Sequence, residues 1–245
     1  MMKIAALSDI HGNLAALDAV LDDIRRQGAN LIVNLGDILS GPLRPSETAD
    51  RLMSLGFATI KGNHERQLLA ADLSRMRQSD RFARDALRAD QLAWVEALPA
   101  TLRLEGDVLL AHGTPQDDES FFLETVTVDG CRPATYDEVA RRAGDTDAAL
   151  ILCGHTHVAR SVKLTDGRLI VNPGSVGLQG YTDTLPFPYR VETGSPHARY
   201  AMVTKTPQGW TAEFRKVEYD WNAAADLAIA NGRPEWEMPL RSGVC

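Results

Sequence analysis

Several residue types that mark common protein classes are scarce in this chain. Three of its 245 residues are cysteine (Cys131, Cys153 and Cys245), too few and too scattered for a disulfide framework or a thiolate zinc site. We therefore expect a reducing, cytoplasmic setting. No apolar run approaches the roughly 20 residues of a membrane-spanning helix. The carboxylate of Asp9 comes too early for a secretory signal peptide, and no membrane contact is expected.

Positive charge and aromatic side chains are also in short supply. Lys and Arg total 26 against 33 Asp and Glu, a formal net charge of −7, which excludes the broad basic face of a protein that coats nucleic acid. Aromatic residues make up 6% of the chain, and hydrophobic residues 44%. No repeat or linker divides the sequence, so we expect a single domain over residues 1–245. The composition does not indicate an oligomeric state.

Apolar patterning predicts alternating strands and helices in the first hundred residues. Strands are expected over 3–7, 31–35 and 57–60, with helices between Asn13 and Gly28 and over 45–55, the arrangement of βαβ units. Residues 66–98 are helix-prone, with a break expected near Ser79-Asp80. An exposed face is predicted there, with Asp80 and Asp85 as partners of a set of arginines: Arg75, Arg77, Arg81, Arg84 and Arg88.

The second half of the chain is rich in predicted strands. Hairpins are expected around Gly106-Asp107, 165–167 and 207–210, and helices over 136–142 and 222–230. Two stretches, 114–135 and 180–199, are predicted to be long loops. Long loops in compact domains often act as lids or binding loops. Their aromatic residues are therefore candidates to roof a cleft, with packing beneath their own loops as an equal alternative.

Five of the six histidines fall in short polar motifs, each placed directly after a predicted strand. The motifs are Asp9-Ile10-His11-Gly12-Asn13, Gly36-Asp37, Gly62-Asn63-His64-Glu65, His112-Gly113 and Gly154-His155-Thr156-His157. A lone histidine or a lone Gly-Asp is usually a turn residue, but random placement would rarely produce this set. Because the carboxyl ends of strands in an α/β layer share one edge, the motifs are expected to converge in one cleft.

In this order the motifs resemble those of the calcineurin-like metallophosphoesterase superfamily, over roughly residues 3–175. The resemblance extends to a loop common in small bacterial members, here Asn172-Pro173-Gly174-Ser175. It implies an α/β fold of four layers, an α/β/β/α sandwich in which two mixed sheets are flanked by helices. It also implies two metal ions: one held by Asp9, His11 and His157, the other by Asn63, His112 and His155, with Asp37 bridging both.

The donor types agree with that implication. Imidazole, carboxylate and amide groups without thiolate suit divalent transition metals, with Mn²⁺ as the first expectation and Fe, Zn²⁺ or Ni²⁺ as alternatives. The resemblance implies in-line attack on phosphorus by a metal-bridging hydroxide. His64, which is not a ligand in the family, would protonate the leaving alkoxide. Arg66 and Asn13 are candidate substrate contacts. A solvated helix residue is the alternative for Arg66, and a helix cap the alternative for Asn13.

One motif departs from the protein Ser/Thr phosphatase branch. Ser40 stands where that branch has a carboxylate that orients its catalytic histidine, and Gly41 stands where it has a phosphate-binding arginine. The related symmetrical dinucleoside tetraphosphatases are disfavoured by the same residues. We therefore expect a phosphoesterase acting on a small phosphodiester, nucleotide or dinucleoside polyphosphate. A phosphomonoesterase or Ser/Thr protein phosphatase is the alternative, and a non-catalytic interaction scaffold of the same fold is the alternative of another class.

Overall fold

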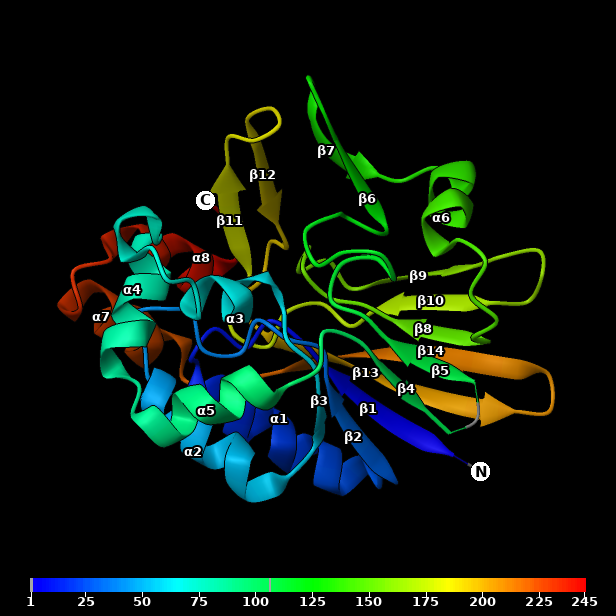
Figure 1. Cartoon of the computed structure of the whole chain (residues 1–245), viewed down its shortest axis with the longest axis horizontal. Helices are drawn as coiled ribbons and strands as arrows, with labels where there is room; N and C mark the ends of the chain where they lie inside the picture. Colours follow the sequence, from blue (N-terminus) through cyan, green and yellow to red (C-terminus); the bar gives the residue numbers. More distant parts are fainter. Residues whose placement is uncertain (1, 106) are drawn as a thin grey trace.

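Figure 1 shows the computed structural model of the chain, which describes residues 2–105 and 107–245. Its centre is a pair of five-stranded mixed sheets. The first has the order β14-β13-β1-β2-β3, formed by β1 (Lys3–Leu7), β2 (Leu31–Asn34), β3 (Ala58–Thr59), β13 (Ala198–Thr206) and β14 (Gly209–Val217). The second has the order β4-β5-β8-β10-β9, formed by β4 (Leu102–Leu104), β5 (Val108–Leu110), β8 (Leu150–Leu152), β9 (Arg160–Lys163) and β10 (Leu169–Asn172).

Helices lie on the outer faces of the sheets, and two further hairpins stand above the strand ends (Figure 1). The helices are α1 (Leu14–Gln27), α2 (Pro45–Leu55), α3 (Asn63–Leu68), α4 (Gln78–Ala86), α5 (Ala89–Ala97), α6 (Tyr136–Ala143), α7 (Trp221–Ala230) and α8 (Glu237–Ser242), with 3₁₀ turns at Leu73–Arg75 and Pro234–Trp236. The hairpins pair β6 (Glu124–Thr127) with β7 (Gly130–Pro133), and β11 (Gly180–Asp183) with β12 (Tyr189–Glu192).

Side chains along β1 alternate between the two faces of the first sheet, and this alternation shows how the layers stack. Ala5 and Leu7 belong to the hydrophobic cluster that contains α1 and α2, whereas Ile4 and Ala6 belong to the cluster between the two sheets. A third cluster joins α6 to the outer face of the second sheet, through residues that include Val139. The order is therefore helix, sheet, sheet, helix, which confirms the expected four-layer fold.

Three local expectations are corrected by the structure. Residues 114–135 and 180–199 are not plain loops, because each contains a hairpin, and the short alternations over 124–133 and 180–192 were too weak to predict one. The helical stretch is not two helices that meet at Ser79-Asp80. It is interrupted twice, over 69–77 between α3 and α4 and at Leu87-Arg88 between α4 and α5. Asp80 lies in the first turn of α4, where a carboxylate stabilises a helix rather than ending it.

The other hairpin predictions are confirmed by antiparallel pairing of β4 with β5, β9 with β10, and β13 with β14. Gly106, one of the two residues expected in the first of these turns, lies outside the described residues. Asn13 caps α1 and Gly28 ends it in a left-handed conformation, as expected. Within residues 2–105 and 107–245, no helix has both the length and the apolar character that crossing a membrane would require.

Candidate metal centre

The polar motifs meet where the parallel strands end. In one group the donor atoms of Asp9, His11 and His157 lie within 4.8 Å of one another, and in a second group those of Asp37, His112 and His155 do the same. The first four motifs follow β1, β2, β3 and β5, and the last follows β8. Both halves of the fold thus contribute to each group. The structure therefore brings together the side chains that the sequence predicted to converge.

The backbone at these side chains is strained. Six non-glycine residues in the described part of the chain have positive φ, and five of them are Asp9, His11, Asp37, His155 and His157. A left-handed conformation is uncommon for residues with a Cβ, and strained residues of this kind cluster at functional sites. The strain turns each side chain sharply out of its strand end toward the common space.

Two motif glycines are required by close approach. A Cβ added to Gly62 would collide with Oδ1 of Asp37, and one added to Gly154 would collide with Oγ of Ser8. Any side chain at either position would push apart the turns that carry the polar groups. The glycines in Gly-Asn-His-Glu and Gly-His-Thr-His thus set the spacing of the centre.

Three histidines direct Nε2 into the same space. His11, His112 and His157 each place Nδ1 2.7–2.8 Å from a backbone carbonyl oxygen, so Nδ1 carries a proton and Nε2 is the atom left for a metal. Nε2 of His11 lies 3.2 Å from Nε2 of His157. Nε2 of His112 lies 3.2 Å from Oδ1 of Asn63 and 3.1 Å from Oδ2 of Asp37.

Acceptor atoms facing one another at these distances repel unless a cation lies between them. Histidines that bind metals characteristically donate their other N–H to a carbonyl or carboxylate, as these three do. Nε2 of His155 is likewise next to a carbonyl oxygen, that of Glu119 at 2.9 Å, which leaves its buried Nδ1 without a partner among the described residues. The donor set therefore fits two divalent transition metal ions.

Burial and charge act in opposite directions on the titratable groups. Burial would lower the pKa of His112, but the carboxylates of Asp37 and Asp9 outweigh it and raise the pKa to about 10. Burial raises the pKa of Asp9 to about 7 and lowers those of His11 and His155 to about 4. The neutral imidazoles are in the form that binds metal, and the proton on His112 is one that a bound cation would displace.

His64 is oriented by a carboxylate from α4. Its Nδ1 lies 2.6 Å from Oδ1 of Asp80, and the hydroxyl of Ser40 donates to the same oxygen. Burial would lower the pKa of His64, but the carboxylates of Asp37 and Asp80 outweigh it and raise the pKa to about 9. His64 therefore holds a proton at neutral pH, and its Nε2 lies 4.0 Å from Oδ2 of Asp37.

The prediction that Asp80 belongs to an exposed ion-paired face is wrong, because the residue is fully buried against His64. Ser40 does not remove the orienting carboxylate from the site. It hydrogen-bonds a carboxylate that arrives from another element. The exposed pair on α4 is Arg81 with Asp85, one turn apart. No sequence signal marked Asp80, since its role depends on how α4 packs against α3.

Glu65 fixes the turn that carries Asp37. Its carboxylate accepts the backbone N–H groups of Asp37 at 2.7 Å, Ile38 at 2.8 Å and Gly62 at 3.0 Å. The side chain is fully buried. The last residue of the Gly-Asn-His-Glu motif thus ties the end of β2 to the start of α3.

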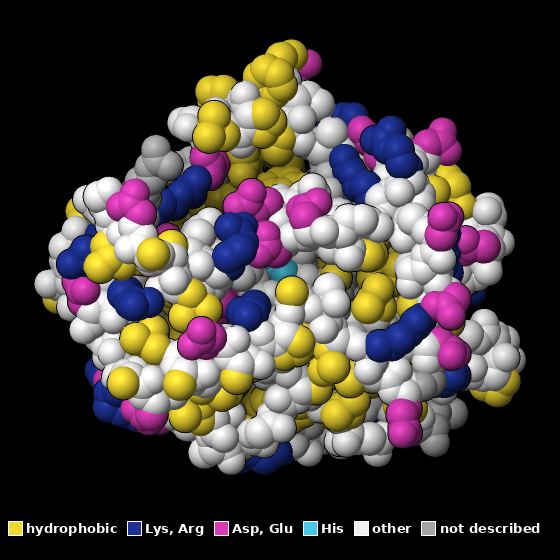
Figure 2. Space-filling view, viewed as in Figure 1, with side chains coloured by type: hydrophobic (Ala, Val, Ile, Leu, Met, Phe, Trp, Pro, Cys, Tyr) yellow, Lys and Arg dark blue, Asp and Glu magenta, His cyan; other side chains and the backbone are white. Residues whose placement is uncertain are grey.

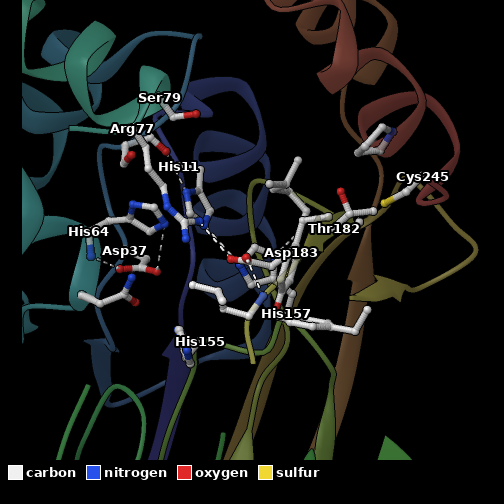
Figure 3. A pocket seen from close by; sticks show the side chains of 18 of the residues that line it. His11, Asp37, His64, Arg77, Ser79, His155, His157, Thr182, Asp183 and Cys245 are labelled. Carbon is white, nitrogen blue, oxygen red and sulfur yellow. Dashed lines mark hydrogen bonds and ion pairs between the residues drawn. The ribbon is translucent and has the colours of Figure 1, made fainter. Parts of the chain in front are cut away.

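A cavity of about 1240 Å³ opens beside the centre, and His11, Asp37, Asn63, His64, His155 and His157 line it. This volume exceeds the roughly 300–1,000 Å³ typical of small-molecule sites. In Figure 3, His64, Asp37 and His11 lie on one side, with Thr182, Asp183 and Cys245 across from them. In Figure 2 other side chains cover the histidines almost completely, apart from a small patch near the middle of the face.

The far walls of the cavity come from parts of the chain that the motifs do not include. Phe121, Tyr181 and Tyr189 line it, and their rings form an edge-to-face series that begins 5.2 Å from the ring of His155. Of the two alternatives for the loop aromatics, lining the cleft applies to these three residues, whereas Phe122 packs in the core beneath its own loop. Trp236, which precedes α8, also lines the cavity, with its ring 6.1 Å from that of His11. No pattern in the sequence marked Trp236 for this wall.

The two candidate substrate contacts lie outside the lining. The guanidinium of Arg66 donates two hydrogen bonds to Asp118 and one to Glu119, all at 2.8 Å. Asn13 is buried, accepts from Ala16 as the helix cap, and donates to the carbonyl of Gly177. Both side chains are engaged within the protein.

Comparisons with known proteins agree with the geometry. A sequence model of the calcineurin-like phosphoesterase superfamily domain matches residues 2–188. The protein MJ0912 of Methanocaldococcus jannaschii is 28% identical over 244 residues, which cover 95% of this chain and 94% of that protein. Phosphodiesterase YfcE of Escherichia coli is 38% identical over 73 residues, which cover 26% of this chain and 40% of YfcE.

A solved structure resembles the chain over its whole length. The metallophosphoesterase from Sphaerobacter thermophilus superposes with a TM-score of 0.76 at 26% identity, covering 99% of each chain. The family match extends over most of the sequence and includes all five polar motifs. The chain therefore belongs to the calcineurin-like phosphoesterase superfamily and is a metal-dependent hydrolase of phosphoric esters.

Proposed function

We propose that the chain hydrolyses a small phosphodiester, nucleotide or dinucleoside polyphosphate at a dinuclear metal centre. The observation that carries this proposal is the convergence of imidazole lone pairs and carboxylates on one space beside a large cavity. The proposed ligands are Asp9, His11 and His157 for one metal and Asn63, His112 and His155 for the other, with Asp37 between them.

Two divalent ions, Mn²⁺ first among them, would supply Lewis acidity and a hydroxide nucleophile near neutral pH. The protein's own side chains would bind the phosphate and donate a proton. His64 lines the cavity and is the proposed general acid, donating from Nε2 to the oxygen of the leaving alcohol. Asp80 is a positioning residue, because it fixes the ring of His64 and favours the protonated form.

The shape of the cavity supports a diester over a protein substrate. Tyr181 and Tyr189 of the β11–β12 hairpin wall one part together with Phe121, and residues from the segment 233–239 wall another with Cys245, so the proposed phosphate position lies inside the cavity. A cavity of this size has room for organic groups on both sides of a phosphate. The similarity to a protein named as a phosphodiesterase, YfcE, points the same way.

A metal analysis followed by a substrate panel tests the proposal. We expect the purified protein to bind about two transition metal ions per chain. Its three free cysteines suit a reducing, cytoplasmic setting in the cell. The Mn²⁺-loaded protein is then offered a model diester, a model monoester, cyclic nucleotides, dinucleoside polyphosphates and a phosphopeptide. Faster turnover of a monoester or the phosphopeptide would contradict the diester proposal. No bound metal and no turnover would favour the scaffold alternative.

A further inference from the structure

The cavity has an end that the metal centre and His64 do not use. It lies between the two upper hairpins and is lined by Phe121, Thr125, Val126, Arg142, Tyr181 and Tyr189, which we call the hairpin end. The rings of Phe121, Tyr189 and Tyr181 connect it to His155 and His157. A molecule bound at the metals can therefore extend along aromatic side chains toward this end.

Three arginines line the cavity, and their charges are not equally neutralised. Arg77 pairs with Asp183 at 3.0 Å, and Arg233 pairs with Glu235. In Figure 3, Arg77 and Asp183 face each other across the cavity. Arg142, within the described part of the chain, has no carboxylate at ion-pair distance. Two acidic residues act on its charge from beyond that distance. Glu138 pairs with Arg132, and the buried Glu124 lies 3.8 Å from the guanidinium of Arg160.

The Arg142 guanidinium is held in place by neutral oxygen atoms. Its Nη1 donates to the carbonyl oxygens of Phe122 at 3.0 Å and Glu124 at 2.8 Å, and its Nη2 donates to the hydroxyl of Thr125 at 2.8 Å. Nε has no partner among the described residues, and the side chain is only partly buried. Since Thr125 accepts through its oxygen, its own hydroxyl hydrogen is free to donate.

A fixed guanidinium with unused donors, next to a free hydroxyl at the end of a cavity, is suited to bind an anion. The side-chain carboxylates that line the cavity away from the metal centre are already paired: Asp183 with Arg77, Glu235 with Arg233, and Glu119 with Arg66. They would therefore oppose an anion at the hairpin end only weakly. Among the described side chains that line the cavity away from the metal centre, Arg142 is the arginine without a carboxylate at ion-pair distance, and Glu138 and Glu124 offset part of its charge from farther away.

We propose that the hairpin end binds a second phosphate group of the substrate, through Arg142 and Thr125. The preferred substrate is then a phosphodiester in which one ester group carries an aromatic ring and a further phosphate, as a phosphorylated nucleoside does. This inference rests on the proposed function, because the scissile phosphate must lie at the metal centre for the second phosphate to reach Arg142.

A matched pair of diesters tests the proposal. The p-nitrophenyl ester of thymidine 5′-phosphate is compared with the same compound carrying a 3′-phosphate, using the Mn²⁺-loaded protein. Because charge-assisted hydrogen bonds are strong, we expect kcat/KM to be about 10-fold or more higher for the 3′-phosphorylated ester, mainly through KM. Arg142→Gln should abolish this preference and leave kcat/KM for the other ester within about twofold of the wild type.

Control variants separate charge recognition from structure. Arg141→Gln removes the same charge from the exposed neighbour, which does not line the cavity, and should keep the preference. Thr125→Val keeps the side-chain shape and should reduce the preference about threefold, which provides a test if Arg142→Gln does not fold. No preference in the wild type, or an equal loss on both esters in Arg142→Gln, would overturn the proposal.

A binding measurement distinguishes failure of this inference from failure of the proposed function. Thymidine 3′,5′-bisphosphate and thymidine 5′-monophosphate are titrated calorimetrically into the Mn²⁺-loaded protein. We expect the bisphosphate to bind about 10-fold more tightly in the wild type, and equally with the monophosphate in Arg142→Gln. Absence of ester turnover would count against the proposed function, whereas equal wild-type affinity for the two nucleotides would count against a phosphate site at Arg142.

Discussion

Replacing Asp80 by Asn tests how the proton on His64 is held. The substitution keeps the size of the side chain but removes the charge that accepts from His64 Nδ1 at 2.6 Å. A hydrogen bond to a charged group contributes about 1.5–3 kcal/mol. At 1.36 kcal/mol per factor of ten, its loss should slow a step that depends on this proton by about 10- to 150-fold.

The loss should depend on the leaving group. We expect kcat to fall by this factor for thymidylyl-thymidine, whose leaving alkoxide needs a proton. It should change by less than about threefold for bis(p-nitrophenyl) phosphate, whose leaving phenolate does not. Asp85→Asn, on the exposed face of the same helix, is the control and should leave both rates unchanged. Equal slowing of both esters, or no slowing of either, would refute an action of Asp80 through His64.

Three further predictions concern the framework of the centre. Chelation of the metals should lower the melting temperature by about 10 °C, since a ligand at 1,000 times its Kd stabilises a protein by about 4.1 kcal/mol. Added Mn²⁺ should restore the melting temperature, and an unchanged melting curve after chelation would mean that no metal was bound. Glu65→Gln places an N–H donor opposite three backbone N–H groups. It should lower the free energy of unfolding of the metal-free protein in urea by about 3 kcal/mol, and a loss below about 1 kcal/mol would contradict the role of Glu65 in fixing this turn. Gly62→Ala should lower the metal content because its Cβ displaces Asp37, whereas Gly28→Ala, with open space around its Cβ, should bind the normal amount of metal. Normal metal content in Gly62→Ala would contradict the requirement for glycine beside Asp37.

Local patterns were sufficient to predict the strands that carry the motifs. The edge of a sheet is a property of topology, so placing polar residues after β1, β2 and β3 was enough to predict that these residues meet. The motifs after β5 and β8 join them because the second sheet stacks on the first. The helix cap at Asn13 and the helix end at Gly28 could also be predicted, because each depends on residues close to it in the sequence. Features of this kind need no knowledge of how distant elements pack.

Other features of the site could not be predicted, because they depend on the packing of elements that are far apart in the sequence. Asp80 looks like any first-turn carboxylate in sequence, and it becomes part of the site only because α4 brings it against His64. Arg66 looked available for phosphate, but the loop that contains Asp118 folds back onto it. The chain that follows α7, with Trp236, has no polar motif, yet it closes one side of the cavity. No periodicity in the sequence encodes such encounters.

The left-handed backbone at five proposed ligands has a consequence for the evolution and engineering of this fold. Each such residue costs of order 1–3 kcal/mol relative to a relaxed conformation. Glycine at Asp9, His11 or His157 would relieve that strain and should make the metal-free protein more stable, while it abolishes the donor atom. Selection for stability of the metal-free protein alone would thus tend to erase the centre. A stabilised variant that keeps activity must gain its stability in the layers of the sandwich, away from the strand ends.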